Sequence, residues 1–360
     1  MTALRPRSLP PGPNLRDART AAHTLAMAPF AFQAARAARD LGLLAQLHAA
    51  PADGIIAADI VRALALPATS VSVLLDACLA IGLAAEIAPG RWRLTSVGDV
   101  WLLDSWVAID AEFTHAVCWP GLADLTESLR QAKPVGLAHF GGWATIYEGL
   151  ASLPEEIRRP WFAYDHAHSD SAFAAAIAVL RASGARRVLD VGGNTGRFAI
   201  ALLGTLPHVS VTLLDHPGQL AEATRNLTAA GFAERSACVP MDLLDHSQLF
   251  PTGQDAVWMS QFLDCFGPSD VVSLLRRARA ALAPGGSVWV LEVCPDRQEE
   301  HAAAASLRLA SLYFTAIANG VSRFYRASDL LVLAESAGLV PAESHDGLGT
   351  AHSLFRLIPA

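Results

Sequence analysis

The chain has 360 residues, of which 52% are hydrophobic, and its formal net charge is −7 at pH 7. This length is enough for a large hydrophobic core and for two domains, whereas the negative charge disfavours nucleic acid as a partner. No apolar stretch reaches the length of a membrane span, and the first residues, MTALRPRSLPPGPN, lack the apolar core of a signal peptide. We therefore expect a cytoplasmic protein that binds neither a membrane nor nucleic acid.

All five cysteines are expected to be buried thiols. Their number is odd and no two of them form a C-x-x-C pair, which argues against a disulfide framework and against a zinc site. A buried free cysteine behaves as a small hydrophobic side chain. The residues concerned are Cys78, Cys118, Cys238, Cys265 and Cys294.

The N-terminal third is predicted to be a winged helix. After a proline-rich leader, an Ala-rich helical pattern runs from about Asp17 to Leu47, followed by the helical segments GIIAADIVRALAL and TSVSVLLDACLAIGL and by a hairpin that turns at Pro89 and Gly90. Three helices and a hairpin in this order are typical of a winged helix. The helix that would read DNA contains Asp76 and no Lys or Arg, so it has no groups for phosphates. We expect it to pack rather than to bind DNA.

The middle stretch, from Asp104 to Asp170, is predicted to be helical and is rich in aromatic residues. Aromatic residues at helical spacing are typical of a plain core, but a segment between two domains is also where small ligands bind. We predict that Trp143 and Phe162 line a substrate site there. His166, near the end of the stretch, is a candidate base, and the alternative is a surface histidine.

The C-terminal half predicts an α/β fold with a doubly wound, mostly parallel sheet, because strand and helix patterns alternate from Arg187 onward. At its start, Asp190 lies in a short apolar strand, and Gly192, Gly193 and Gly196 form the turn into a helix. Glycine has no Cβ, so a ligand can approach the turn closely. The amides that open the helix can face an electron-rich group. The pattern predicts a small ligand bound over the turn.

Acids also close the next two strands. Asp215 ends the second strand, where an acid is placed to accept hydrogen bonds from ribose hydroxyls. Asp242 follows the run that ends at Val239. If the ligand is a nucleoside, we expect Asp242 beside its base, with Met241 or Leu243 against the ring face. An acid at one strand end is often only a turn residue, but acids at successive strand ends favour a nucleoside-like ligand.

The spacing Asp-x-Gly-x-x-x-Gly from Asp190 resembles the first motif of class I S-adenosylmethionine (SAM) methyltransferases. Asp215 with Pro217 is similar to the D-x-P of small-molecule O-methyltransferases, and Pro284-Gly285-Gly286 to their turn before the fifth strand. The resemblance implies that SAM is the cofactor and S-adenosylhomocysteine the product. It also implies that the residues named above bind SAM, and we add Ser260 to them.

The whole chain resembles the plant caffeate and acetylserotonin O-methyltransferases and their bacterial relatives. This implies a winged-helix dimerisation domain over residues 1–105, a helical connector lining the substrate cleft over 106–180, and a SAM-binding domain over 181–360. A helix as apolar around its surface as Ala18–Ala38 needs a partner surface beyond one small domain. We therefore predict a homodimer formed through the N-terminal helices, and no metal in catalysis.

The resemblance fails at the catalytic base. In those enzymes the segment after the fourth strand reads H-D-W and its His removes the acceptor proton, whereas here Asp264 occupies that position. The supporting Glu of the family's N-G-G-x-E-R-T segment is missing too. We assign the matching residues Asn319, Arg323 and Tyr325 to acceptor binding. Glu292, near the end of the fifth strand, is expected to face the cleft.

Several mechanisms remain open. Asp264 could act as the base if burial raises its pKa, and His166 is the second candidate. Alternatively, the acceptor ionises alone, or a ring carbon is activated by an ortho hydroxyl. The leading prediction is SAM-dependent methylation of an aromatic, phenolic small molecule of secondary metabolism, with O-methylation ahead of C- or N-methylation. The alternatives are a SAM-binding relative that has lost methyl transfer and a winged-helix regulator that senses a ligand.

Overall fold

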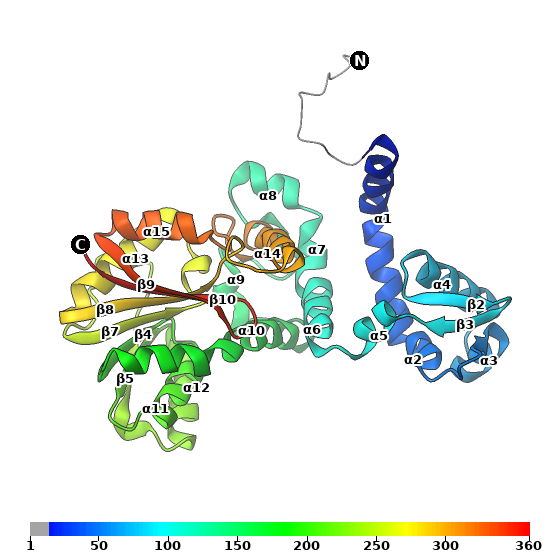
Figure 1. The fold of residues 1–360 in the computed structure, drawn as a ribbon. Helices are drawn as coiled ribbons and strands as arrows, with labels where there is room; N and C mark the ends of the chain where they lie inside the picture. Colours follow the sequence, from blue (N-terminus) through cyan, green and yellow to red (C-terminus); the bar gives the residue numbers. More distant parts are fainter. Residues whose placement is uncertain (1–13) are drawn as a thin grey trace, which may run out of the picture. The chain divides into compact units, whose positions relative to one another are not determined.

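The structure is a computed structural model that describes residues 14–360, so the proline-rich leader of the sequence lies outside the described residues. The chain divides into two compact units, one ending at Ala111 and the other running from Glu112 to Ala360, both drawn in Figure 1. The predicted three-part division of the chain stays a prediction, because the described boundary falls inside one helix, Ser105–Phe113.

The first unit has the predicted order of helices followed by a hairpin. Its three-stranded antiparallel sheet has the order β1-β3-β2, and the hairpin turns at the predicted residues Pro89 and Gly90. The helices pack on this sheet around one core that includes Leu44, Ile60 and Leu75. The elements are α1 (Leu15–Asp40), α2 (Leu43–His48), β1 (Ile55–Ile56), α3 (Ala57–Leu64), α4 (Ala68–Ala80), β2 (Ala84–Ala88), β3 (Arg91–Leu94) and α5 (Ser96–Leu103).

Only the C-terminal part of helix α1 packs into the core of the first unit. Asn14 caps its start by accepting a hydrogen bond from the backbone N–H of Asp17 at 3.1 Å. Near its other end Ala35 and Ala38 are buried. Leu25, by contrast, is 75% exposed, so the first half of α1 presents an apolar surface.

The second unit contains one seven-stranded sheet with the order β6-β5-β4-β7-β8-β10-β9. The strands are β4 (Arg187–Val191), β5 (Ser210–Asp215), β6 (Ser236–Pro240), β7 (Gln254–Ser260), β8 (Leu282–Val293), β9 (Leu339–Leu348) and β10 (His352–Pro359). Helix α6 (Ser105–Phe113) contains the boundary between the units. The helices after it are α7 (Trp119–Leu122), α8 (Leu125–Gln131), α9 (Ile146–Gly149), α10 (Glu155–Ala182), α11 (Arg197–Thr205), α12 (Pro217–Ala229), α13 (Pro268–Ala281), α14 (His301–Tyr313) and α15 (Ala327–Ser336).

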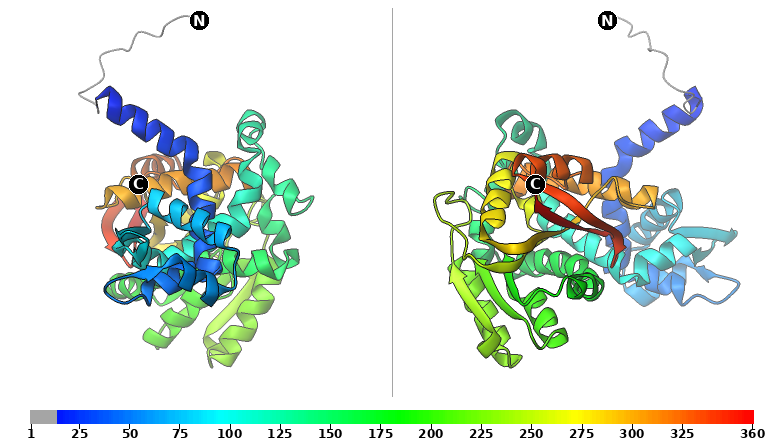
Figure 2. Two further views of the ribbon diagram at one scale, coloured as in Figure 1. Left: turned by 90° about the vertical axis from the view of Figure 1, so that its right-hand side faces the viewer. Right: turned by 60° about the vertical axis from the view of Figure 1, so that its left-hand side comes forward.

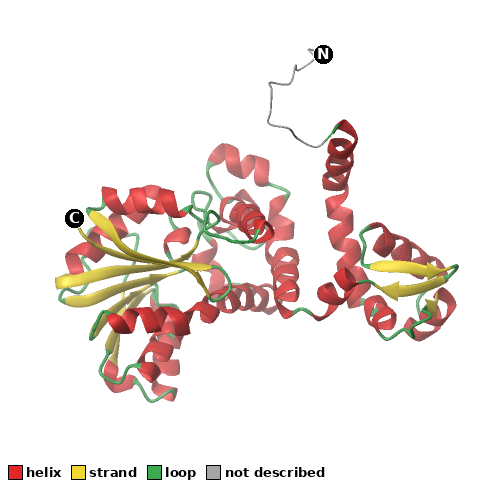
Figure 3. Ribbon diagram, in the orientation of Figure 1, coloured by secondary structure: helices red, strands yellow, loops and turns green. Residues whose placement is uncertain are grey.

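Helices cover both faces of this sheet, as the doubly wound prediction requires (Figure 3). One core lies between the sheet and the pair α13 and α15, and includes Val257 and Leu274. A second core lies between the opposite face and helices α10, α11 and α12, and includes Leu213 and Ile177. Burial on both faces explains why the central strands read as almost continuous apolar runs. The predicted fold class is therefore confirmed.

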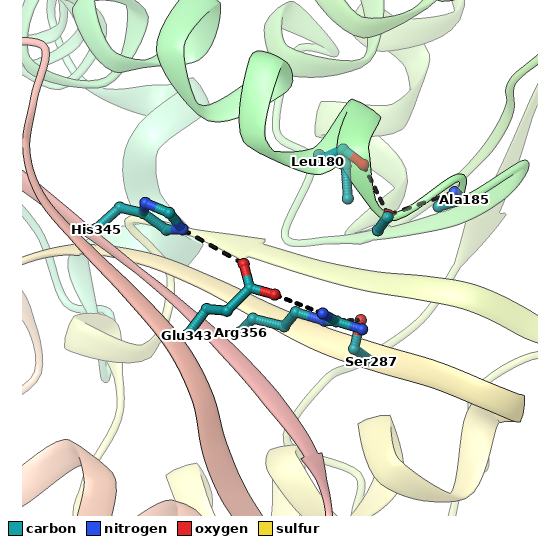
Figure 4. Close-up of polar contacts among 7 residues, drawn as sticks. Leu180, Ala185, Ser287, Glu343, His345 and Arg356 are labelled. Atoms are coloured by element: carbon teal, nitrogen blue, oxygen red, sulfur yellow. Dashed lines mark hydrogen bonds and ion pairs between the residues drawn. The ribbon is translucent and has the colours of Figure 1, made fainter.

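The antiparallel hairpin β9–β10, drawn in red in Figure 2, completes the sheet beside β8. Polar side chains bridge these three strands (Figure 4): Arg356 donates to Glu343 at 2.6 Å and to the hydroxyl of Ser287 at 3.4 Å. His345 contacts the same Glu343. These bridges are partly exposed, so each contributes little to stability.

The Pro284-Gly285-Gly286 turn is not a separate loop, as the sequence predicted, but an irregular part of β8. The register against β7 shifts between Gln254 and Ala256, and Gly285 has φ 81°. A residue with a Cβ is strained at such a φ, which explains the glycine.

Residues 14–360 contain no single helix suited to span a membrane, no cluster suited to hold a metal ion and no disulfide bond. No single helix there has both the length and the apolar composition of a membrane span, although the bent pair α3 and α4 meets these criteria jointly. No group of three or more His, Cys, Asp or Glu side chains gathers as a metal site would need. All five cysteines are free thiols. The cytoplasmic location stays a prediction.

Candidate active site

The second unit contains a cavity of about 510 Å³ at the carboxyl ends of the parallel strands. Because β4 runs parallel to β5 and β7, the ends of these strands meet at one edge of the sheet. The glycine turn after β4, the end of β5 and the short turn Leu263–Cys265 after β7 form one side of the cavity. Aromatic residues from α9, α10 and the segment after α14 form the other side.

The glycine turn has no room for side chains. Gly192 has φ 73°, and a Cβ there would collide with the ring of Phe262. A Cβ on Gly193 would lie 3.0 Å from the Oδ2 atom of Asp190. Both glycines line the site as predicted, whereas Gly196, with φ 82°, caps α11 and does not line it.

Two residues of the site hold a backbone conformation that L residues rarely adopt. Asn194 has φ 46° and Gln261 has φ 43°, and both line the cavity. Such strain persists only where surrounding contacts hold it, and it is common at functional sites. The backbone N–H of Asn194 donates to Asp215 at 2.9 Å, which is one such contact.

A smaller pocket of about 70 Å³ adjoins the cavity and contains several unsatisfied polar atoms. The buried atoms without a hydrogen-bond partner include Asp190 Oδ2, Ser260 Oγ, Gln261 Oε1 and His166 Nε2. A buried polar atom that lacks a partner costs free energy. Four such atoms in one pocket fit a ligand that offers both donors and acceptors, as the amino-acid part of SAM does.

The surroundings of Asp190 also disfavour the charged form of its carboxyl group. Burial raises the pKa of its carboxyl to about 8, and the nearby charge of Asp215 adds to the shift. Burial also lowers the pKa of His166. The pocket therefore holds a neutral imidazole and a carboxyl group that a bound cation would ionise.

The remaining predicted cofactor residues line the larger cavity. Asp215 accepts the backbone N–H groups of Asn194 at 2.9 Å and His216 at 2.7 Å, and burial raises its pKa. Asp242 is exposed and accepts the N–H of Leu244 at 3.0 Å. Leu243, beside it, is buried. Carboxylates and an apolar side chain in this order fit a ribose and an adenine ring.

Two carboxyl groups face the aromatic end of the cavity. Asp264 is 5% exposed, and its pKa is raised to about 7 by burial and by the charge of Asp165. Asp165, on α10, has its own pKa raised to about 6 by burial and by Asp170. Carboxyl groups with pKa values of about 6 to 7 can exchange protons near neutral pH. Asp165 also lies in the sequence at the end of the aromatic stretch, but the sequence prediction chose its neighbour His166 instead.

His166 lines the small pocket and not the large cavity. Its ring lies 5.5 Å from that of Phe162. The structure thus places this candidate base away from the large cavity, next to Asp190 and Ser260 in the small pocket.

The aromatic wall differs from the predicted one. Trp161 and Tyr164 line the cavity together with Tyr147, and the Trp161 indole donates to the Tyr313 hydroxyl at 2.7 Å. Residues three and four apart share one face of a helix, so Trp161, Tyr164 and Asp165 face the cavity together. Phe162 points to the neighbouring face.

Neither predicted aromatic residue lines the cavity. Phe162 packs against Trp161, with ring centroids 5.0 Å apart. Trp143 lies over Gly149, where a Cβ would collide with the indole. Both residues support the wall from behind, and the proposed acceptor contacts move to Tyr147, Trp161 and Tyr164.

Of the three residues assigned to acceptor binding from the sequence, Asn319 and Tyr325 hold the turn that carries Asp264, and Arg323 does not contact it. Asn319 lines the cavity, but its amide donates to the carbonyl of Cys265 at 2.7 Å. The Tyr325 hydroxyl donates to the carbonyl of Phe266 at 2.7 Å. Arg323 pairs with Asp329 at 2.7 Å. Arg323 and Tyr325 do not line the cavity, so their contacts favour support over acceptor binding.

Glu292 is buried behind the site rather than facing it. Its Oε1 atom accepts the backbone N–H groups of Phe262 at 3.0 Å and Leu263 at 2.8 Å. Burial raises its pKa well above the usual value. This expectation from the sequence was wrong: Glu292 holds the turn before Asp264 and does not contact the cavity.

Comparisons with known proteins agree with this architecture. A family model described as the O-methyltransferase domain matches residues 124–340, and one described as the Dimerisation2-like domain matches residues 19–92. The chain is 30% identical to the L-tyrosine C(3)-methyltransferase of Streptomyces lavendulae over 291 residues, which cover 80% of this chain and 77% of the relative.

Two further relatives extend the comparison. The 3-hydroxy-5-methyl-1-naphthoate 3-O-methyltransferase of Streptomyces sahachiroi is 29% identical over 76% of this chain and 77% of its own length. The apo structure of the S-adenosylmethionine-dependent methyltransferase SibL matches with a TM-score of 0.72 and 28% identity, covering 95% of this chain and 99% of SibL. With a matching family model over residues 124–340, a Dimerisation2-like domain before it and a doubly wound sheet with a cavity at its strand ends, the chain belongs to the O-methyltransferase domain family and is a SAM-dependent methyltransferase.

Proposed function

We propose that this enzyme methylates a phenolic aromatic small molecule of secondary metabolism. The observation that carries the proposal is the pair of carboxyl groups, Asp264 and Asp165, at the aromatic end of the cavity. The adjoining pocket of unsatisfied polar atoms is suited to SAM. The relatives named above act on tyrosine and on a hydroxynaphthoate, and both of these acceptors are phenols.

The chemistry needs a nucleophile, a methyl group and a proton acceptor. Bound SAM supplies the methyl group on a sulfonium. Asp264 would accept the proton of the acceptor hydroxyl, for which a carboxyl group with a pKa near 7 is a better base than an ordinary Asp. The aromatic wall would hold the ring, and a held geometry supplies much of the acceleration of a displacement. The phenolate oxygen would then gain the methyl group that bound SAM supplies.

O-methylation is the leading outcome, and C-methylation is the second candidate. Methylation of a ring carbon needs two proton removals, one from the hydroxyl before methyl transfer and one from the ring carbon after it. The oxygen regains a proton in the product, so one proton is released in total. Two carboxyl groups beside the ring, Asp165 and Asp264, suit that requirement. The catalytic His that the resemblance led us to expect is absent here, which also fits a mechanism that differs from that of the O-methyltransferases.

Incubation with isotopically labelled SAM and a panel of phenols and catechols tests the proposed function. We expect one labelled methyl group in at least one product by mass spectrometry. Proton NMR then separates a methoxy signal from a ring methyl signal. Activity should persist in EDTA, because we propose no catalytic metal. Failure to methylate any phenol on the panel would count against the proposal.

A ligand-sensing winged-helix regulator remains the rival of a different class. Helix α4, in the position that reads DNA in winged helices, carries Asp76 and no Lys or Arg. Without cations it has no means of neutralising phosphates. The comparisons offer it no support.

We propose that two chains form a homodimer through the N-terminal helices. The exposed apolar face of α1 supports this, since such a face is usually covered by a partner. Leu25→Asp should convert the dimer into a monomer, because it buries an unpaired charge in the interface. Leu249, equally exposed at 75% but outside α1, offers the matched control Leu249→Asp, which should stay dimeric. Light scattering after size exclusion measures both, and a dimeric Leu25→Asp variant would contradict the interface.

A further inference from the structure

We infer that the acceptor is a phenol that carries a protonated amine and no free carboxylate. The inference rests on the proposed function and names the class of its substrate. It follows from the charges that line the cavity.

The cavity is lined by acids and by no Lys or Arg within the described residues. Two of the acids, Asp215 and Asp242, belong to the half that fits the nucleoside of SAM. The acids on the acceptor side are Glu148, Asp165, Asp264 and Asp270.

Only part of this negative charge is balanced by the protein. Asp264 has an exposed fraction of 5% and takes part in no ion pair among the described residues. The charges of His168 and Arg197 act on Asp165, but burial and Asp170 outweigh them and raise its pKa. Asp270 has a partner, since it lies 3.2 Å from His246. A buried carboxylate without a counter-charge favours a cationic ligand and disfavours an anionic one.

The nearby arginines are already engaged. Arg323 pairs with Asp329, and Arg197 pairs with Asp170 through a bond of 3.1 Å from its Nε atom. An acceptor carboxylate would therefore meet acids without meeting a free guanidinium. Such a carboxylate would be repelled by the buried Asp264 and the half-buried Asp165 whenever these are ionised.

The aromatic wall adds attraction for a cation. The faces of aromatic rings are electron-rich and bind ammonium groups, particularly where water is excluded. Tyr147, Trp161 and Tyr164 line the same cavity as Glu148 and the two buried acids. Rings and carboxylates together are the usual surroundings of a bound ammonium.

Three catechols that differ only at the end of the side chain test the inference: dopamine, which is cationic, 4-propylcatechol, which is neutral, and 3-(3,4-dihydroxyphenyl)propionate, which is anionic. We expect kcat/KM to fall in that order at pH 7.5, with dopamine about 100-fold above the propionate. Affinity for the full-length dimer in the presence of S-adenosylhomocysteine, measured by calorimetry, should follow the same order. This second readout does not depend on turnover.

Glu148→Gln should lower the ratio of dopamine affinity to propylcatechol affinity, because it removes one carboxylate from the cavity. Glu335→Gln is the matched control: Glu335 is exposed on α15 and does not line the cavity, so the ratio should not change.

The outcomes separate the two proposals. The inference is overturned if the three catechols bind equally and are turned over equally, or if none of them binds. Equal turnover would still leave the proposed function standing. Binding in the expected order without any methyl transfer supports the inference and counts against the proposed function. Preferred turnover of the propionate overturns the inference.

Discussion

Asp264→Asn is expected to lower kcat by about 10²–10⁴-fold, the contribution of a general base, while the affinity for SAM stays within a few-fold. Asn keeps the size of the side chain but cannot take a proton. Asp264 occupies the position where the family places its His, and it lies on a turn fixed by Glu292 and Asn319. Steady-state rates and calorimetry on the purified protein measure the two quantities.

The pH dependence of kcat/KM should report the same groups. A protonated carboxyl cannot accept the acceptor's proton, so the rate should rise as pH increases through about 6 to 7, the pKa values of Asp165 and Asp264. A bound cation lowers both pKa values, so cationic acceptors should move the rise of kcat, which reports the complex, toward lower pH, whereas the rise of kcat/KM should stay in place. In Asp264→Asn the residual rate should follow Asp165 alone.

A stability measurement separates catalytic loss from misfolding. The pKa of Asp264 is higher in the folded state than in the unfolded state, so its ionisation costs folding free energy as pH rises through about 7. Asp264→Asn removes that cost. At pH 8 the ligand-free variant should melt roughly 2–4 °C above the wild type for each kcal/mol recovered.

Two further variants test the other candidate bases: Asp165→Asn and His166→Ala. Asp165→Asn should also lose activity, whereas His166→Ala should mainly weaken SAM binding, because His166 lines the cofactor pocket. If Asp264→Asn and Asp165→Asn each lose less than a few-fold in kcat, neither is the base. Catalysis would then rest on positioning alone.

The cofactor half of the site could be predicted from the sequence because its signals are local. Gly192 and Gly193 follow a strand directly, and Asp215 ends the next one, so strand patterns alone bring them to one edge. Asp264 could be predicted because it lies a few residues after the end of β7. In each case the position along the chain determines the position in space.

The acceptor half could not be predicted in the same way. Which face of α10 meets the cavity depends on packing against distant segments, such as the bond from Trp161 to Tyr313. One step along that helix exchanges Phe162 for Trp161 and His166 for Asp165. The role of Glu292 likewise depends on hydrogen bonds to a turn some 30 positions earlier in the chain. Side-chain partners of this kind leave no periodic pattern in the sequence.

SAM binding is expected to release a proton at pH 7. The carboxyl of Asp190 has a pKa of about 8 in the ligand-free protein because of burial and the repulsion from Asp215. At pH 7 it is therefore mostly protonated, and binding of the cationic SAM should ionise it. The affinity should accordingly rise with pH up to about 8, and one site per chain should be filled. Calorimetry in two buffers with different ionisation enthalpies measures the released proton.

Two substitutions test the residues that couple SAM binding to the release of a proton. Asp190→Asn should abolish the proton release and weaken SAM binding by about 10- to 100-fold, since a hydrogen bond to a charged group is lost. Asp215→Ala should also weaken binding, and it should lower the pKa of Asp190 because the repulsion disappears, so less proton is released at pH 7. Asp76→Asn, in α4 of the first unit, is the control and should change neither quantity. If the wild type binds SAM with the same heat in both buffers, Asp190 does not change its ionisation on binding, and its assignment to the cofactor's cationic part is wrong.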